Sequence, residues 1–293
     1  MHRFVIGLAG LTLAVAGGCL SAPPAQAQTP HRIVSLNLCT DQLLLLLAPD
    51  RIAALSGLAS DPLLSVMSDT ARAYPSIGAD AEEILGQAPD LVVAAPFAAT
   101  ATVNLLRRLG KRVLVVEFAS DVDGLKRALR QLGQEIGAGD KAEALIGSLD
   151  AALPPKSAGG SESDRLKPSA LVINFGGLPS GKTSLADTAL GLAGYRNAAG
   201  DYRTDRKGTI QLESLLAHPP DLLVLGQEAE DYHTVRADNL RHPALLALTR
   251  LIPTAHLPQR LTLCATPALA DAVHLLADRR DEAQRRAVLR GQP

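Results

Sequence analysis

The stretch EEILGQAPDLVV at residues 82–93 recurs as ESLLAHPPDLLV at residues 213–224. Its first Glu, its Pro and its Asp all recur at an offset of 131 residues (213 minus 82). Each copy has the pattern of a short helix, a Pro-Asp turn and an aliphatic strand, which is a common junction in α/β proteins. Two such junctions at one offset favour a chain built as two similar α/β lobes.

On both sides of these two copies, short aliphatic runs alternate with helical stretches along the chain. The predicted strands are residues 33–36, 91–95 and 113–116 in the first half, and 171–174, 222–225 and 255–257 in the second. The predicted helices of the first half are residues 41–47, 80–87, 102–109 and 122–132, with Gly110 and Gly133 ending the last two. This alternation predicts the α/β class, with parallel sheets in two Rossmann-like lobes.

The lobes are expected at residues 31–139 and 168–293. Residues 140–153 carry apolar side chains at helical spacing and are predicted to form a connecting helix. Residues 154–167 begin with two prolines and continue as a polar, Gly/Ser-rich stretch, which is typical of a surface loop.

The amino terminus has the order of an export signal. His2 and Arg3 precede an uncharged apolar run, and Ala25-Gln26-Ala27 follows as a cleavage site. The run is shorter than the roughly 20 residues that cross a bilayer. We therefore expect residues 1–27 to be a cleaved signal peptide and the protein to be periplasmic; lipid anchoring at Cys19 is the less favoured alternative.

The net charge and the composition limit which classes of molecule the protein is expected to bind. The 29 basic and 30 acidic residues give a net charge of −1, so nucleic acid is not an expected partner. Aromatic residues make up only 3% of the chain and Trp is absent.

Four ordered segments carry a family resemblance. They are Arg32-Ile33-Val34-Ser35-Leu36, Ile77-Gly78 leading into residues 82–92, Leu109-Gly110-Lys111-Arg112-Val113, and Gly194-Tyr195-Arg196-Asn197. In this order the mature chain resembles the iron-chelate and cobalamin periplasmic binding proteins of ABC importers. The resemblance implies two lobes joined by one long helix, a metal chelate held between them, and an ABC transporter permease as partner.

The resemblance also implies that one glutamate on each lobe docks onto arginines of the permease. Glu82 and Glu213 match those positions. The alternative is that each carboxylate only complements the positive end of its helix. Glu83 competes with Glu82, either as a capping partner of Asp80 or as the docking carboxylate itself.

Ligands of open parallel sheets bind beyond the carboxyl ends of the strands. Phe97, Phe118 and Phe175 each follow a predicted strand, so we expect an aromatic-lined cleft. The alternative is that these rings close the ends of the sheets as core residues.

Polar candidates occupy similar places. Asn37 and Thr40 follow the first strand, and Arg203 and Arg206 lie in a basic segment that borders the ligand in the family. The arginines would give charge-assisted hydrogen bonds to an anionic chelate, or they form a solvated basic loop. Cys39 and Cys264 are interpreted, in order of preference, as buried apolar residues, an inter-lobe disulfide, or soft metal ligands in the cleft.

Residues 176–183, GGLPSGKT, satisfy the phosphate-loop pattern G-x-x-x-x-G-K-[ST]. Export and the absence of an aliphatic run ending in Asp weigh against a nucleotide-binding protein, and the same loop aligns with a cleft loop in which Lys182 would contact ligand. An exported hydrolase is a third alternative, but the chain has no G-x-S-x-G elbow.

The favoured function is a monomeric solute-binding protein without catalytic residues, resident metal or cofactor. The chain has no Trp and only four Tyr, so a binding site built on several stacked aromatic rings is not expected and haem is disfavoured. A ferric siderophore or a corrinoid remains as the expected ligand.

Overall fold

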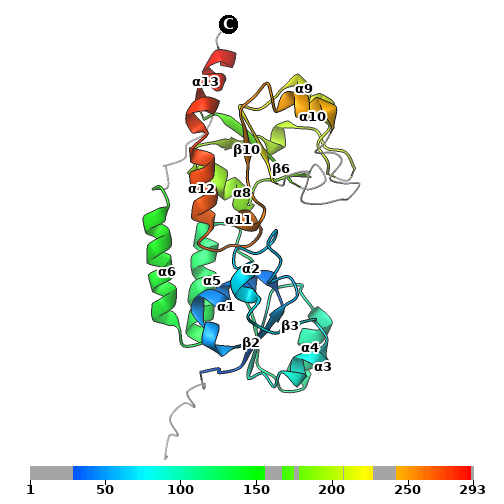
Figure 1. Ribbon diagram of the computed structural model, residues 1–293, viewed down its shortest axis with the longest axis vertical. Helices are drawn as coiled ribbons and strands as arrows, with labels where there is room; N and C mark the ends of the chain where they lie inside the picture. The colour runs from blue at the N-terminus through cyan, green and yellow to red at the C-terminus, as the bar shows by residue number, and fades with distance from the viewer. Residues whose placement is uncertain (1–28, 156–166, 175–177, 207, 227–241, 292–293) are drawn as a thin grey trace, which may run out of the picture.

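The computed structural model describes residues 29–155, 167–174, 178–206, 208–226 and 242–291. Figure 1 shows two α/β lobes, one above the other, with helices α5 and α6 running alongside. The predicted fold class is therefore confirmed. The proposed signal peptide and residues 156–166 of the proposed surface loop lie outside the described residues.

The first lobe contains a five-stranded parallel sheet in the order β3-β2-β1-β4-β5. Its elements are β1 (Ile33–Ser35), α1 (Leu38–Leu47), β2 (Ile52–Ser56), α2 (Ser68–Ala71), β3 (Ser76–Ile77), α3 (Ala81–Gly86), β4 (Leu91–Ala94), α4 (Thr100–Arg108) and β5 (Val113–Val115). The strands β1 and β4 are buried along their whole length, which is why β4 is a continuous apolar run and only Ser35 interrupts the apolar residues of β1.

The second lobe has the sheet order β10-β9-β6-β7, with β8 also paired to β6. Its elements are β6 (Ser169–Asn174), β7 (Leu178–Pro179), α8 (Leu185–Leu192), β8 (Arg196–Asn197), α9 (Leu212–Ala217), β9 (Leu222–Leu225), α10 (Pro243–Leu248), β10 (Thr254–His256), α11 (Arg260–Leu263), α12 (Leu269–Ala277) and α13 (Arg280–Gly291). The short β7 runs antiparallel to β6, so this sheet is not wholly parallel as expected. Pro179 and Leu178 of β7 lie opposite Ile173 and Asn174 of β6, the register of an antiparallel pair.

The sequence repeat corresponds to a structural repeat. Helices α3 and α9 begin 131 residues apart (212 minus 81), as do strands β4 and β9 (222 minus 91). The repeated aspartates do the same work in both lobes. Asp90 accepts hydrogen bonds from the backbone N–H groups of His31 and Arg32 just before β1, and Asp221 accepts one from Ser169 at the start of β6. The Pro-Asp turns therefore fix the entrance to each central strand.

The two lobes are linked by a helical hairpin, α5 (Val122–Glu135) and α6 (Gly139–Ala152). Gly110 follows the end of α4 with a positive φ of 74°, as its predicted role requires. The prediction that Gly133 ends its helix is wrong, because α5 continues past it. A Cβ at Gly133 would lie 2.8 Å from the Cβ of Ala142, so this glycine allows α6 to pack closely on α5.

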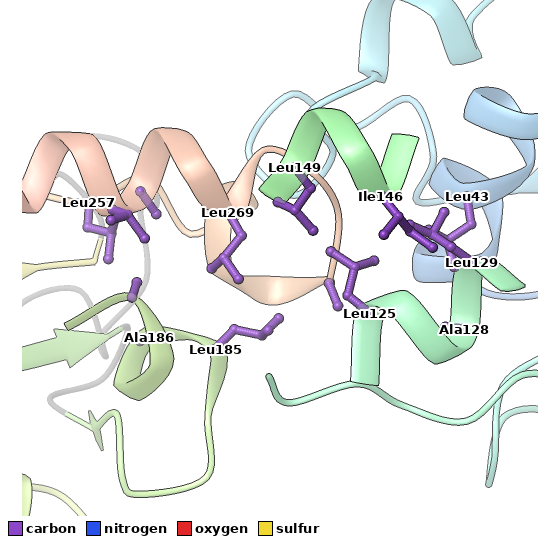
Figure 2. Close-up of a cluster of buried hydrophobic side chains, with 14 of the residues drawn as sticks. Leu43, Leu125, Ala128, Leu129, Ile146, Leu149, Leu185, Ala186, Leu257 and Leu269 are labelled. Carbon is purple, nitrogen blue, oxygen red and sulfur yellow. The ribbon is translucent and has the colours of Figure 1, made fainter. Parts of the chain in front are cut away.

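One hydrophobic core runs through both lobes and the hairpin. Figure 2 shows Leu125 and Leu129 of α5 and Ile146 and Leu149 of α6 meeting side chains from both lobes. In the second lobe, the same buried cluster includes Leu185, Ala186, Leu257 and Leu269. The lobes are therefore packed against each other through this hairpin.

Candidate functional site

Two exposed aromatic rings lie at the carboxyl edge of the first sheet. Phe97 follows β4 and is 94% exposed, and Phe118 follows β5 and is 56% exposed. Strands β4 and β5 are neighbours, with Ala94 opposite Val115 at their ends. The two rings therefore leave the same sheet edge from adjacent strands, and neither closes the core.

The backbone that carries Phe97 has an unusual conformation. Phe97 has a φ of 63° and Ala99 a φ of 48°, both in the left-handed region that non-glycine residues rarely adopt. Each such residue costs of order 1–3 kcal/mol. A strained loop that holds a phenylalanine in solvent is typical of a binding site, because neither the strain nor the exposure helps the fold.

Asn37 and Thr40 shape the turn between β1 and α1. The Asn37 side chain accepts a hydrogen bond of 2.9 Å from the backbone N–H of Cys39 and so caps α1. The Thr40 hydroxyl donates to the Asn37 carbonyl at 2.9 Å and lies 2.7 Å from the Ser35 hydroxyl. Because Thr40 is only 2% exposed, the prediction that it contacts ligand is corrected to a structural role.

Cys39 and Cys264 form a disulfide with their Cα atoms 5.1 Å apart. It joins the start of α1 in the first lobe to the end of α11 in the second. The preferred interpretation as separate buried thiols is therefore wrong, and neither sulfur is left as a free thiolate for a metal. Cys39 follows the central strand of its sheet, whereas Cys264 follows the edge strand β10.

The carboxyl edge of the second sheet carries cations and an apolar side chain. Arg203 and Arg206 are exposed near a bridge between Thr204 and Ile210, and Leu178 beside this segment is 41% exposed. Phe175 and Lys207 lie outside the described residues.

Lys182 lies away from this edge. The chain after β7 runs back along β6, where the backbone N–H of Ser180 bonds to Val172. Lys182 then lines a cavity of about 990 Å³ between the helical hairpin and α8, together with Arg196 and Asn197 of β8, the strand that pairs with the amino end of β6. Charged pairs such as Lys126 with Asp150, at 2.5 Å, line the same cavity. The structure thus does not bring Lys182 together with the exposed rings.

The two candidate docking glutamates occupy equivalent places. Glu82 and Glu213 are each exposed at the second residue of their helix, α3 and α9. In Figure 1 both helices lie on the side of the molecule away from α6. Glu83 is engaged locally, because its carboxylate accepts a 2.8 Å hydrogen bond from the backbone N–H of Gly78. This contact leaves Glu82 as the counterpart of Glu213.

Sequence reasoning gave no role to Asp41, a fully buried carboxyl at the carboxyl edge of the first sheet. Burial raises its pKa from 3.8 to about 6, although hydrogen bonds with Ser35 and Ser56 oppose the rise. Leu58, 52% exposed beyond β2, and Leu178 were also missed. Their position after strands is a usable signal, but their exposure is visible only in the folded chain.

The phosphate-loop alternative receives no support. Its first two glycines lie outside the described residues, and the Thr183 hydroxyl donates to the carbonyl of Lys182. Asp221 is engaged at the start of β6 by Ser169 and pairs with Arg290, so it does not supply a magnesium ligand. In the described part of the chain, no three His, Cys, Asp or Glu side chains cluster as metal ligands.

Comparison with known proteins identifies the family. The sequence model of the family described as periplasmic binding protein matches residues 33–249. A search of curated proteins finds no match.

Within the described residues, no helix has the length and apolarity to span a membrane.

Solved structures with a similar fold come from several bacteria. A periplasmic heme binding protein from Pseudomonas aeruginosa has 21% identity and a TM-score of 0.66, over 86% of this chain and 92% of that one. An ABC-type Fe³⁺-hydroxamate transport protein from Saccharomonospora viridis has 23% identity and a TM-score of 0.60, over 85% and 92%. The periplasmic vitamin B12 binding protein of Vibrio cholerae has 16% identity and a TM-score of 0.60, over 87% and 98%. These likenesses establish the fold.

Proposed function

Because the chain belongs to the periplasmic binding protein family, we propose that it captures a metal chelate between its two lobes and delivers it to an ABC permease. The observation that carries this proposal is the pair of exposed rings, Phe97 and Phe118, at one sheet edge. A ligand with an apolar face would cover them. Burying a phenylalanine side chain contributes roughly 1.5–3 kcal/mol, so the pair supplies a substantial part of micromolar affinity.

Charge on the opposite lobe refines the ligand class. Arg203 and Arg206 are exposed on the second lobe and would form charge-assisted hydrogen bonds with carboxylate, catecholate or hydroxamate oxygens. A ferric siderophore fits this combination of an apolar face and anionic oxygens, and a corrinoid fits the rings. The structural relatives named for heme, ferric hydroxamate and vitamin B12 agree with a metal chelate as the class.

We assign docking onto the ABC permease, the step that delivers the ligand, to Glu82 and Glu213. Their equal positions on α3 and α9 place one exposed carboxylate on each lobe. Complementing a helix terminus does not require this symmetry, whereas two arginines of a permease would each form a bidentate pair with one carboxylate. We further propose that the protein is a monomer and that residues 1–27 direct its export. It would have no catalytic activity, resident metal or cofactor.

Native mass spectrometry of the protein purified from the periplasm tests the function. A coloured, metal-containing mass that copurifies with residues 28–293 supports chelate capture. Cleavage at another site, or retention of a lipid on Cys19, would correct the export mechanism alone. Turnover of ATP or of an ester by the purified protein would instead favour the nucleotide-binding or hydrolase alternatives.

A further inference from the structure

Within the described residues, contacts between the lobes include two zones. In the first, which we call the link zone, the hairpin α5–α6 contacts the second lobe. There the Thr188 hydroxyl donates to the carbonyl of Ser120 at 3.0 Å, and the His274 ring lies 3.0 Å from the carbonyl of Ala152. This zone also contains the covalent path from α6 into β6 and the shared hydrophobic core.

The second zone, which we call the disulfide zone, joins the start of α1 to α11. It contains the Cys39–Cys264 bond, and near it the Arg260 guanidinium donates to the carbonyl of Pro62 at 3.5 Å. Cys39 comes four residues after the end of β1 (39 minus 35), at the sheet edge that also carries Phe97 and Phe118. The disulfide therefore lies at the edge where the proposed ligand binds.

We propose that the Cys39–Cys264 disulfide is a second covalent hinge point, which restricts the rotation of the lobes relative to each other and thereby keeps the two walls of the cleft facing one another. The link zone already restrains the lobes through packing on the hairpin. A covalent bond at a second place, between α1 and the end of α11, removes further rotations of one lobe against the other. The disulfide is this second restraint.

The constraint is transmitted because both cysteines are rigidly held. The backbone N–H of Cys39 is bonded to the Asn37 side chain, and the neighbouring Thr40 hydroxyl bonds back to the Asn37 carbonyl. On the other lobe, Cys264 is 1% exposed and is followed by the buried Ala265 and Thr266. Asn37 and Thr40, which sequence reasoning assigned to the ligand, thus act as positioning residues for the disulfide.

The consequence is a preorganised cleft. Without the disulfide, the lobes would sample additional orientations in which the two walls do not face one ligand. Apparent affinity falls in proportion to the fraction of molecules in the competent orientation. If this fraction drops to between a third and a tenth, the dissociation constant rises roughly three- to tenfold.

The primary test measures lobe orientation and needs no ligand. Ketone-bearing amino acids at Leu109 and Leu251, both exposed and on different lobes, accept spin labels without using cysteine chemistry. Pulsed EPR then gives the distance distribution in the oxidised protein and in the Cys39→Ser/Cys264→Ser variant. We expect a narrow distribution in the oxidised protein and a clearly broader one in the variant. Equal widths would overturn the proposal.

Reduction provides a second route if the variant does not fold. The labelled wild-type protein is treated with a phosphine reductant, which converts the disulfide to two thiols and is itself oxidised to the phosphine oxide with an oxygen atom from water. Thiol titration confirms two free thiols, and circular dichroism confirms that the protein stays folded. Broadening on reduction supports the hinge, and an unchanged distribution contradicts it.

The affinity arm rests on the proposed function. Haemin, ferric desferrioxamine B and cyanocobalamin are titrated into oxidised and disulfide-free protein, and the dissociation constant of any chelate that binds should rise roughly three- to tenfold. If none of the three binds the oxidised protein, the proposed ligand class is in doubt while the EPR result still decides the hinge. An unchanged dissociation constant despite a broader distance distribution would refute the claim that the disulfide keeps the walls of the cleft facing one another.

Discussion

Replacing the buried carboxyl of Asp41 should change how stability depends on pH. Asp41 is fully buried and accepts hydrogen bonds from the backbone N–H of Ser56, at 3.3 Å, and from the Ser56 hydroxyl. These bonds favour the ionised carboxylate, but burial outweighs them and raises the pKa from 3.8 to about 6. The perturbation we choose is Asp41→Asn, which keeps the shape and removes the titration.

The sign follows from the raised pKa. The folded state favours the protonated carboxyl, so its stabilising contribution is complete below pH 3.8 and is lost as the pH rises through about 6. At about 1.4 kcal/mol per pH unit, the difference between the two pKa values corresponds to a loss of about 3 kcal/mol by pH 8. The introduced amide does not ionise, so the variant avoids this loss.

Urea denaturation of both proteins between pH 4 and pH 8 measures the effect. The stability of Asp41→Asn relative to wild type should rise by about 2–3 kcal/mol over this range, whatever constant offset the altered hydrogen bonds introduce. Asp69→Asn is the control for the substitution itself, because that side chain is 90% exposed. A flat difference for Asp41→Asn would refute the assignment of a desolvated carboxyl.

Charge reversal in Glu82→Arg/Glu213→Arg should abolish uptake in cells while the dissociation constant of the purified protein stays unchanged; a large loss of affinity would instead place these residues in the binding site. Removing the disulfide in Cys39→Ser/Cys264→Ser should lower the free energy of unfolding by about 5 kcal/mol in urea titrations, because the bond closes a loop across 225 residues; an unchanged midpoint would show that the bond adds no stability. Lys182→Ala should leave chelate affinity within about twofold and ATP should give no thermal shift, since Lys182 lines the cavity beside α8; magnesium-dependent protection by ATP would revive the phosphate-loop interpretation.

The aliphatic strands and the repeat were readable from the sequence because their signal is local. Strand β4 is buried on both faces, so polar residues do not alternate with apolar ones along it. The two Pro-Asp turns are separated by the same 131 residues as the glutamates that precede them. The edge of the sheet was not readable. Strand β3 has only two residues, and β2 alternates in burial too weakly to stand out.

Features that depend on contacts between distant parts of the chain could not be predicted from the sequence. Gly133 reads as a helix stop, but its purpose is contact with Ala142 on the next helix. The pairing of Cys39 with Cys264 depends on how two lobes meet across 225 residues, and no spacing rule encodes that. Lys182 was expected in the cleft because its loop aligns with a cleft loop of the family, yet β7 runs antiparallel to β6 and takes the chain away from that edge.

We propose above that Phe97 and Phe118, the exposed rings at the edge of the first sheet, bind a metal chelate. The most direct measurement is calorimetric titration of ferric desferrioxamine B, cyanocobalamin and haemin into wild-type protein, Phe97→Ala/Phe118→Ala and the control Leu109→Ala. Leu109 is 54% exposed, similar to Phe118, but follows α4 at the opposite end of β5. We predict that at least one chelate binds wild type and Leu109→Ala alike and binds the double variant at least about tenfold more weakly, as the loss of about 1.4 kcal/mol or more requires. If all three proteins bind the chelates equally well, or if wild type binds none of them, the proposal that Phe97 and Phe118 bind a metal chelate is contradicted.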